Sequence, residues 1–186
     1  MALNNREQPA KFYFAYGSNL STTQMQHRCP RSTPIGLAHL AGWTWIINER
    51  GYANIVADGQ ANDGRPGVYG LVYRLHPDDE NMLDRYEGVP FAYKKVTIRI
   101  SKENFLEPDQ ERSPSEPASS RNLVDGDGIE LLTYVDILRI TSSVPQEEYI
   151  DRMNLGIKES SKWGLPAAYV DEVMRRYIPA PKTPLN

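Results

Sequence analysis

The sequence predicts an α+β fold in which peripheral helices surround a compact, mixed, barrel-like sheet. Strand patterns come first along the chain, with intervening helices, and the C-terminal portion is helical. The chain has 186 residues, 40% of them hydrophobic and 24% charged, which suits one domain with a sizeable core. We therefore expect a disordered tail at residues 1–10 and a single domain over residues 11–180.

Charge and cysteine content restrict the partners and the compartment. The net charge is −3 and the basic residues are scattered, so no nucleic-acid partner is expected. Cys29 is the only cysteine, which excludes an intrachain disulfide and a cysteine-based metal cluster within one chain. The polar N-terminus lacks the apolar core of a signal peptide, and no apolar stretch is long enough to cross a bilayer. We expect a cytoplasmic protein without a membrane partner.

The first predicted elements are a strand, a turn and a short helix. Residues 11–16, KFYFAY, are aromatic-rich and have β character. A helix is expected from Leu20 to His27. At its start, Ser21-Thr22-Thr23-Gln24 fits a capping box, in which the serine hydroxyl and the glutamine side chain satisfy free amides.

Four strands and a helix follow. Gly42, Gly51 and residues 58–66 supply the turns between the strands. A proline and three acidic residues mark the start of a helix over residues 77–86, because acids complement the positive end of a helix dipole, and Gly88 ends it. The four strands are expected at residues 35–40, 43–48, 52–57 and 67–75.

The second half contains two strands, an insertion and two helices. Residues 92–100 and 129–137 have strand character. Between them, residues 103–128 show no apolar periodicity, which predicts a mobile insertion whose role as a lid, a partner-binding loop or an inert linker stays open. A second capping box at Ser143-Val144-Pro145-Gln146 and Pro166 mark the starts of the C-terminal helices.

The turn after the first strand is the first candidate site. A strand that runs into a tight glycine-containing turn and then into a capped helix presents backbone amides to an anion. Gly17 lets the main chain approach a ligand closely, and Ser18 and Asn19 add short polar arms. The alternative is an ordinary βα turn, since serine and asparagine favour turns for local reasons. The candidate residues are Tyr16, Gly17, Ser18, Asn19 and Leu20.

Glu87 is the second candidate, as a catalytic acid/base. It lies at the C-terminal end of the predicted helix over 77–86, where the negative end of the dipole raises the pKa of a carboxyl group. Burial would raise that pKa further and make Glu87 a better base. The alternative is an exposed helix-end glutamate without a special function. The neighbours that could bury it are Tyr86, Val89, Phe91 and Tyr93.

Other candidates are weaker. The histidines are not at metal-ligand spacing and follow no nucleophile motif, so we interpret them as structural or surface residues and expect no metal site. Asp125 to Gly128 faintly matches a calcium loop but lacks the remaining ligands, which favours a flexible turn. Tyrosines on predicted strands are more often core than site, although one or two could present a hydroxyl to a polar pocket. The histidines are His27, His39 and His76, and the tyrosines are Tyr69, Tyr73, Tyr93 and Tyr134.

As an ordered set, these motifs resemble the γ-glutamylcyclotransferase family. Tyr16 to Leu20 matches the family's Tyr-Gly-Ser-Asn-Leu signature. Leu83 to Val89 matches its Leu-Asp-x-x-Glu-Gly-Val, with Tyr93 at the opening of a strand. Gly164 to Tyr169 looks like the start of the family's C-terminal helix, so that the resemblance spans roughly residues 11–178.

The resemblance implies a compact mixed α/β barrel with a cavity between the turn and Glu87. Members of the family cyclise a γ-glutamyl group into 5-oxoproline and release the attached amine, usually an amino acid or a dipeptide. Glu87 would take a proton from the substrate's α-amine and return it to the leaving nitrogen, while amides of the turn hold the α-carboxylate or the oxyanion. Tyr93 and Tyr134 are further candidates for substrate contact. Because the attack is intramolecular, no cofactor is expected; the partner is a small γ-glutamyl molecule, and the chain is a monomer or homodimer.

Two alternatives stay open. The same chemistry could serve a biosynthetic pathway by removing a γ-glutamyl group from a specialised metabolite. The chain could instead be a non-catalytic γ-glutamyl-binding module, although such a module has no use for a base at the negative end of a helix. The Tyr-Gly-Ser-Asn-Leu turn favours glutathione and γ-glutamyl amino acids over γ-glutamylamines, but the sequence does not specify the leaving group.

Overall fold

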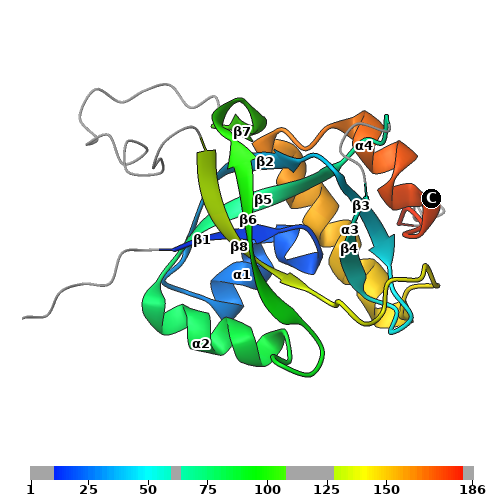
Figure 1. Cartoon of the computed structure of the whole chain (residues 1–186). Coiled ribbons are helices and arrows are strands. Elements are labelled where there is room, and N and C mark those ends of the chain that lie inside the picture. The colour runs from blue at the N-terminus through cyan, green and yellow to red at the C-terminus, as the bar shows by residue number, and fades with distance from the viewer. Residues whose placement is uncertain (1–10, 60–63, 108–127, 182–186) are drawn as a thin grey trace, which may run out of the picture.

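The computed structural model describes residues 11–59, 64–107 and 128–181. Its main feature is a six-stranded sheet that curls into a half-barrel, beside a separate two-stranded hairpin (Figure 1). In spatial order the six strands are β6 (Lys94–Ser101), β8 (Gly128–Val135), β1 (Lys11–Ala15), β5 (Val68–Leu75), β2 (Thr33–Leu40) and β7 (Phe105–Leu106). The hairpin consists of β3 (Trp43–Ile47) and β4 (Ala53–Ala57). β1 pairs in parallel with β8 and the other neighbours are antiparallel, which confirms the predicted mixed sheet.

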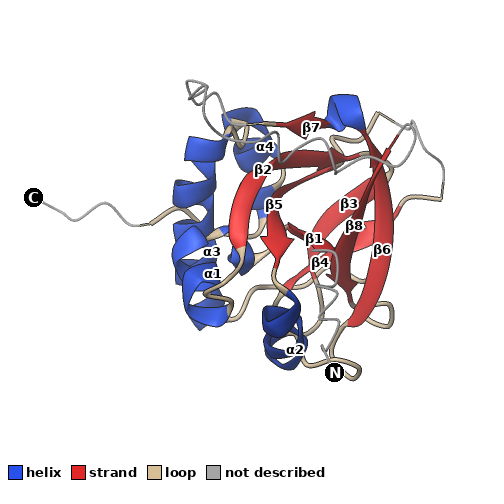
Figure 2. Cartoon of the chain, turned by 90° about the vertical axis from the view of Figure 1, so that its left-hand side faces the viewer, coloured by secondary structure: helices blue, strands red, loops and turns tan. Residues whose placement is uncertain are grey.

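The helices lie around this sheet, as predicted. Figure 2 shows α1, α3 and α4 gathered on one side of the curled sheet and α2 at one end of it. Short 3₁₀ turns extend or connect the main elements. The α-helices are α1 (Thr22–Arg28), α2 (Pro77–Tyr86), α3 (Glu147–Ser160) and α4 (Ala167–Glu172). The 3₁₀ turns are η1 (Ser18–Leu20), η2 (Lys102–Asn104), η4 (Ser161–Trp163) and η5 (Met174–Arg176).

One hydrophobic cluster joins side chains of the half-barrel, the hairpin and the helices. Leu20 of η1 belongs to it and is fully buried. A Cβ on Gly156 would lie 3.1 Å from the Cβ of Leu20, so the missing side chain lets α3 pack closely on η1. The largest fully buried side chains are Trp45, Tyr73, Phe14, Leu20, Met25, Leu37, Ile47, Ile55, Leu71, Leu75, Leu83 and Leu131.

The capping box predicted at Ser21 to Gln24 is confirmed for the serine but not for the glutamine. The Ser21 hydroxyl accepts a hydrogen bond from the Gln24 amide at 3.0 Å, and α1 begins at Thr22. The Gln24 side chain instead donates to Ser18 and Asn19, so it supports the turn before the helix. The helix starts later than predicted because residues 18–20 form the 3₁₀ turn η1.

The second capping box is wrong. α3 begins at Glu147 after Gln146, and no side chain caps its first amides. The Gln146 side chain donates instead to the Arg50 carbonyl at 3.0 Å. The Gln146 side chain therefore stabilises the β3–β4 turn rather than the N-terminus of α3.

The predicted insertion over residues 103–128 is wrong at its N-terminal end. Phe105 and Leu106 form β7, which pairs with Ala38 and Leu37 of β2, directly after the 3₁₀ turn η2. A Cβ on Gly36 would meet the Phe105 ring at 2.6 Å, so a glycine in β2 provides the space that this ring fills. Residues 108–127 of the insertion and the predicted tail at 1–10 lie outside the described residues.

Within the described ranges, none of the helices is both long enough and apolar enough to span a membrane.

Candidate active site

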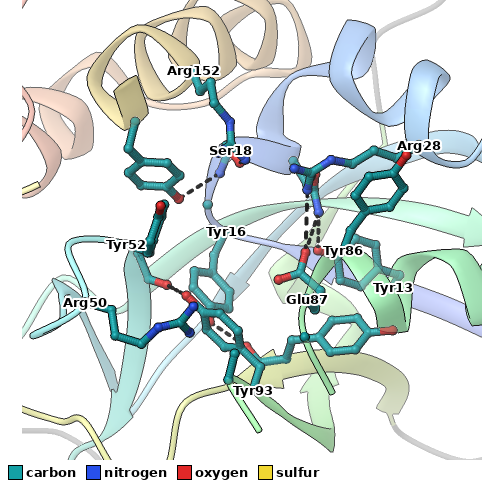
Figure 3. A pocket seen from close by; sticks show the side chains of 17 residues that line it. Tyr13, Tyr16, Ser18, Arg28, Arg50, Tyr52, Tyr86, Glu87, Tyr93 and Arg152 are labelled. Carbon is teal, nitrogen blue, oxygen red and sulfur yellow. Dashed lines mark hydrogen bonds and ion pairs between the residues drawn. The ribbon is translucent and has the colours of Figure 1, made fainter. Parts of the chain in front are cut away.

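A cavity of about 240 Å³ opens beside the half-barrel, where the β3–β4 turn meets the end of β1 and the ends of α1 and α2 (Figure 3). Its volume is close to the lower end of the roughly 300–1,000 Å³ range of ligand pockets, so it suits a small molecule. Its charged lining residues are Glu87, Arg28, Arg50 and Arg152. Tyrosine rings supply much of the remaining wall, namely Tyr13, Tyr16, Tyr52, Tyr86, Tyr93, Tyr134 and Tyr149.

Among the described residues, Glu87 is the only carboxylate that lines this cavity. It caps the C-terminus of α2, and Gly88, with φ 64°, reverses the chain after it. Its Oε1 accepts a hydrogen bond from the Asn19 amide at 3.0 Å and lies 3.8 Å from Nη1 of Arg28. No described residue donates to Oε2. The carboxylate is thus fixed through one oxygen, while the second is available to a ligand.

Burial is the main cause of the electrostatic state of Glu87. It raises the pKa of the carboxyl above its ordinary value, and the opposing effects of Arg28 and the Asn19 amide do not cancel the shift. The predicted burying neighbours contribute unequally. Tyr93 is buried and lines the cavity, but Phe91 is 86% exposed and cannot cover Glu87. The rings of Tyr13, in β1, and Tyr16, directly after it, line the same cavity although they are far away in the sequence.

The turn at residues 16–20 lies directly beside Glu87, as the two sequence motifs suggested. Asn19 joins them, because its Nδ2 donates to Glu87 Oε1 and to the Tyr13 hydroxyl, both at 3.0 Å. Its Oδ1 accepts from Gln24 at 2.7 Å and from Arg28 at 3.1 Å. With its amide saturated in this way, Asn19 orients the carboxylate rather than offering a free polar arm to a ligand.

Ser18 and Gly17 form the part of the turn that faces Tyr149. The Ser18 amide donates to the Tyr149 hydroxyl at 3.1 Å, and the Ser18 hydroxyl accepts from Arg152 at 2.8 Å. A Cβ on Gly17 would lie 2.8 Å from the Tyr149 hydroxyl oxygen. The missing side chain of this glycine therefore makes room for Tyr149, a residue of the protein itself. The Gly17 amide donates to no described residue.

Leu20 does not belong to the site. Its side chain is fully buried in the core and does not line the cavity, and its amide donates to the Gly17 carbonyl at 2.9 Å. The prediction of Leu20 as a substrate-binding residue is therefore wrong. Its apolar side chain anchors η1, which fixes the polar residues before it.

The predicted tyrosines line the cavity in different hydrogen-bonding states. The hydroxyl groups of Tyr16, Tyr93 and Tyr134 donate to Tyr134 O, Ala53 O and Asp84 Oδ1, respectively. Tyr13 and Tyr149 were not predicted. Each accepts a hydrogen bond through its hydroxyl and donates to no described residue, so its proton is available. Burial raises the pKa of Tyr149 to about 12 and that of Tyr13 well above its ordinary value, which keeps both groups protonated donors.

Three arginines of the cavity escaped prediction from the sequence. Arg28 ends α1, Arg50 lies in the β3–β4 turn and Arg152 lies on α3. They belong to elements that are far apart in the chain, and no local motif marks them. Only the fold brings them to one cavity, where Figure 3 shows Arg50 on the side opposite to Arg28.

The histidines do not contribute to this site. None lines the cavity, and the described part of the chain contains no group of histidine, cysteine and acidic residues that could hold a metal ion. His76 has a structural role as the N-cap of α2, because its Nδ1 accepts from the Asp78 amide. The faint calcium-loop match lies outside the described residues from Asp125 to Asp127, and only its last residue, Gly128, is described.

Comparison with known proteins identifies a family. Residues 13–112 match the family model described as gamma-glutamyl cyclotransferase, AIG2-like. No protein in the curated set matches the chain. A solved gamma-glutamyl cyclotransferase has 20% identity and a TM-score of 0.64, over 95% of this chain and 92% of that chain. An uncharacterized protein from Homo sapiens has 19% identity and a TM-score of 0.65, over 96% and 94%. YkqA from Bacillus subtilis has 18% identity and a TM-score of 0.62, over 96% of this chain and 58% of that chain.

Proposed function

The chain belongs to the AIG2-like gamma-glutamyl cyclotransferase family, and from this premise we propose that it converts the γ-glutamyl group of a small substrate into 5-oxoproline and releases the attached amine. One observation carries the proposal. Glu87 and the turn at residues 16–20 face the same cavity and are joined by the Asn19 side chain, while Glu87 Oε2 accepts no hydrogen bond from a described residue. This arrangement supports a base placed beside an anion-binding turn.

The proposed reaction begins with proton transfer to Glu87. The substrate's α-amine loses a proton to the carboxylate and attacks its own γ-carbonyl carbon, which closes a five-membered ring. Collapse of the tetrahedral intermediate breaks the bond between that carbon and the leaving nitrogen. The protonated Glu87 then returns its proton to the departing amine. Every atom of the substrate appears in the two products, and the enzyme ends in its starting state.

The remaining groups would hold the substrate in the ring-closing conformation. Arg28 and Arg152 make the side of the cavity near the turn positive, which favours the substrate's α-carboxylate there. The Gly17 amide and the unused hydroxyl protons of Tyr13 and Tyr149 are candidate donors to that carboxylate or to the developing oxyanion. These neutral groups suit this task because each can donate a hydrogen bond to the negative charge and keep its proton.

The test is release of 5-oxoproline from glutathione, γ-glutamyl-alanine and γ-glutamyl-lysine by the wild type and by Glu87→Gln. We expect turnover of at least one substrate, and a loss of about 10²- to 10⁴-fold in kcat for the variant, as is usual for a general acid–base group. Glu80→Gln is the matched control, because Glu80 also lies on α2 but outside the cavity.

Three results would count against the proposal. Full activity of Glu87→Gln would remove the assigned base. Equal losses in Glu87→Gln and Glu80→Gln would show a general effect on α2. Calorimetric binding of the γ-glutamyl compounds without any 5-oxoproline release would make the protein a binding module, whereas release from a γ-glutamyl specialised metabolite alone would retain the chemistry and move it to a biosynthetic pathway.

A further inference from the structure

Arg50 differs from the other two arginines of the cavity in having no polar partner for its guanidinium among the described residues. Arg28 donates to Asn19, and Arg152 donates to Gln24, Ser18 and Glu148. In contrast, Nη1 of Arg50 is buried and makes no hydrogen bond. The guanidinium instead lies over two aromatic rings, 5.5 Å from the centroid of Tyr52 and 5.6 Å from that of Tyr93.

The backbone around Arg50 is held in place by several hydrogen bonds. The Arg50 amide donates to Oδ1 of Asn48 at 3.1 Å, and the Arg50 carbonyl accepts from Gln146 at 3.0 Å. Asn48 is itself fully buried and donates to Asp136 at 3.0 Å. Gly51, with φ 83°, completes the turn, and a Cβ there would meet the Gln146 side chain and amide at 2.8 Å. A fixed turn thus presents an unpaired cation to the cavity.

The buried Nη1 of Arg50 is costly to leave unpaired, since a buried donor without a partner loses its hydration and gains nothing in return. The planar fork of arginine matches a carboxylate, which accepts two parallel hydrogen bonds from it. The Tyr52 and Tyr93 rings contact the guanidinium through cation–π interactions, which use none of its N–H donors. An anionic ligand group with carboxylate geometry therefore fits the unused hydrogen-bonding capacity of Arg50.

The charge and layout of the cavity indicate which carboxylate this is. Among the described residues, three arginines and one glutamate line it. Arg28 lies beside Glu87 and Arg152 forms an ion pair with Glu148, which leaves Arg50 as the arginine of the cavity without an acidic partner in the described part of the chain. The α-carboxylate of the γ-glutamyl group lies beside the turn in the proposed function, so Arg50 is left for a second carboxylate. Arg50 lies across the cavity from Arg28 (Figure 3), and its neighbour Tyr52 is only partly buried, so the Arg50 side of the cavity lies nearer to solvent.

We propose that Arg50 binds the carboxylate of the departing group, so that the substrates are γ-glutamyl amino acids or peptides rather than γ-glutamyl amines. This inference rests on the proposed function and adds a specificity-determining residue to it. The leaving group would extend from the buried region near Glu87 toward the Tyr52 side, with its carboxylate on the Arg50 guanidinium.

The experiment compares γ-glutamyl-alanine with γ-glutamyl-ethylamide, which lacks only the carboxylate of the leaving group. We would measure kcat/KM for 5-oxoproline release by the wild type, Arg50→Met and Arg50→Lys. Arg50→Met is expected to lower kcat/KM for γ-glutamyl-alanine by about 10- to 100-fold and to leave the value for the ethylamide nearly unchanged. Arg50→Lys should recover part of the loss, because it restores the charge without the planar fork.

The change in the ratio of kcat/KM between the two substrates is the decisive quantity, since it cancels the intrinsic reactivity of the two leaving amines. Arg31→Met, which removes a positive charge at the surface, should leave both kcat/KM values unchanged.

Several outcomes would contradict the inference. Equal losses of kcat/KM on both substrates in Arg50→Met, together with a shift in the pH profile of activity, would mean that Arg50 acts on Glu87. That result would overturn the inference while the proposed function stands. Wild-type turnover of the ethylamide alone would also overturn it. Release of 5-oxoproline from neither substrate, nor from glutathione, would contradict the proposed function itself, and the inference with it. Thermal melting of each variant separates these results from unfolding.

Discussion

Glu87 is a carboxylate held in a cavity walled by tyrosines, with the Asn19 amide and the Arg28 guanidinium as its nearest donors. Burial raises its pKa above the ordinary value, and the two donors only partly oppose this. A raised carboxyl pKa in the folded state means that the native protein binds this proton more tightly than the unfolded chain. The stability that this proton gives is present at low pH and is lost as the pH rises through the folded-state pKa.

We therefore predict that Glu87→Gln raises the melting temperature at pH 7.5 while it removes turnover. The amide keeps an acceptor for Asn19 but carries no charge, so burial no longer opposes folding. The gain should shrink as the pH falls through the folded-state pKa and disappear well below about 4.3, the ordinary glutamate pKa, where the carboxyl is protonated in both states. Differential scanning calorimetry at several pH values measures it, since a domain of this size moves by about 2–4 °C per kcal/mol.

Glu80→Gln is the control, for which the expected change in melting temperature at pH 7.5 has the opposite sign. Partial burial raises the pKa of Glu80, but hydrogen bonds from Lys11 and Lys95 outweigh that effect and lower it below the ordinary value. Its stabilisation is present at neutral pH and is lost as the pH falls, so Glu80→Gln should melt below the wild type at pH 7.5 and approach it in acid. A lower melting temperature for Glu87→Gln at pH 7.5 would show that Glu87 stabilises the fold.

Among the residues of the candidate site, some could be predicted from the sequence and others could not, for a physical reason. Glu87 and the polar residues of the turn lie in short motifs whose local chemistry is visible along the chain. The arginines do not, because each comes from a different element and acquires a role only when the fold brings them together. Leu20 was assigned to the site because it belongs to the same motif, but an apolar residue in a polar turn most often serves as its anchor.

The turn formed by Gly17 and η1 is the element on which the site depends. Its apolar end is fixed in the core by Leu20, and its polar end is held by Tyr149, Gln24 and Arg152. Propensity and capping patterns predicted most strands, α2 and the Ser21 cap, because these depend on neighbouring residues. They failed for β7 and for the start of α3, where a distant strand and the β3–β4 turn decide the structure.

At the scale of this turn we predict that Gly17→Ala lowers kcat/KM on the order of 10- to 100-fold, as expected for a displacement of about 1 Å at a site. The new Cβ would lie 2.8 Å from the Tyr149 hydroxyl oxygen, so either the turn or the Tyr149 ring must move. Gly59→Ala is the matched control, because a Cβ there meets no atom within 4 Å. In a Tyr149→Phe background the cost of Gly17→Ala should be smaller, since the clashing oxygen is gone. Additive losses in the double variant would refute the assigned clash.

At the scale of the whole molecule, the cavity is shared between two sheets. The half-barrel supplies Tyr13 from β1, and the hairpin supplies the turn that carries Arg50. Side-chain hydrogen bonds connect the hairpin to residues that directly follow β1 and β8, from Trp45 to the Tyr16 carbonyl at 3.0 Å and from Asn54 to the Asp136 carbonyl at 2.9 Å. A site built in this way can be maintained only while the hairpin stays in register with the half-barrel.

We therefore predict that residues 11–180 unfold in one cooperative transition, as a single domain would. Trp43→Phe combined with Trp163→Phe leaves Trp45 as the only tryptophan, and its indole reports on the junction between the two sheets. Urea denaturation followed by Trp45 fluorescence, by far-ultraviolet circular dichroism and by 5-oxoproline release should give coincident midpoints and one slope. Loss of the fluorescence signal and of activity at a lower urea concentration than the loss of dichroism would mean that the hairpin detaches first. The chain would then consist of two units, with the leaving-group side of the cavity on the weaker one.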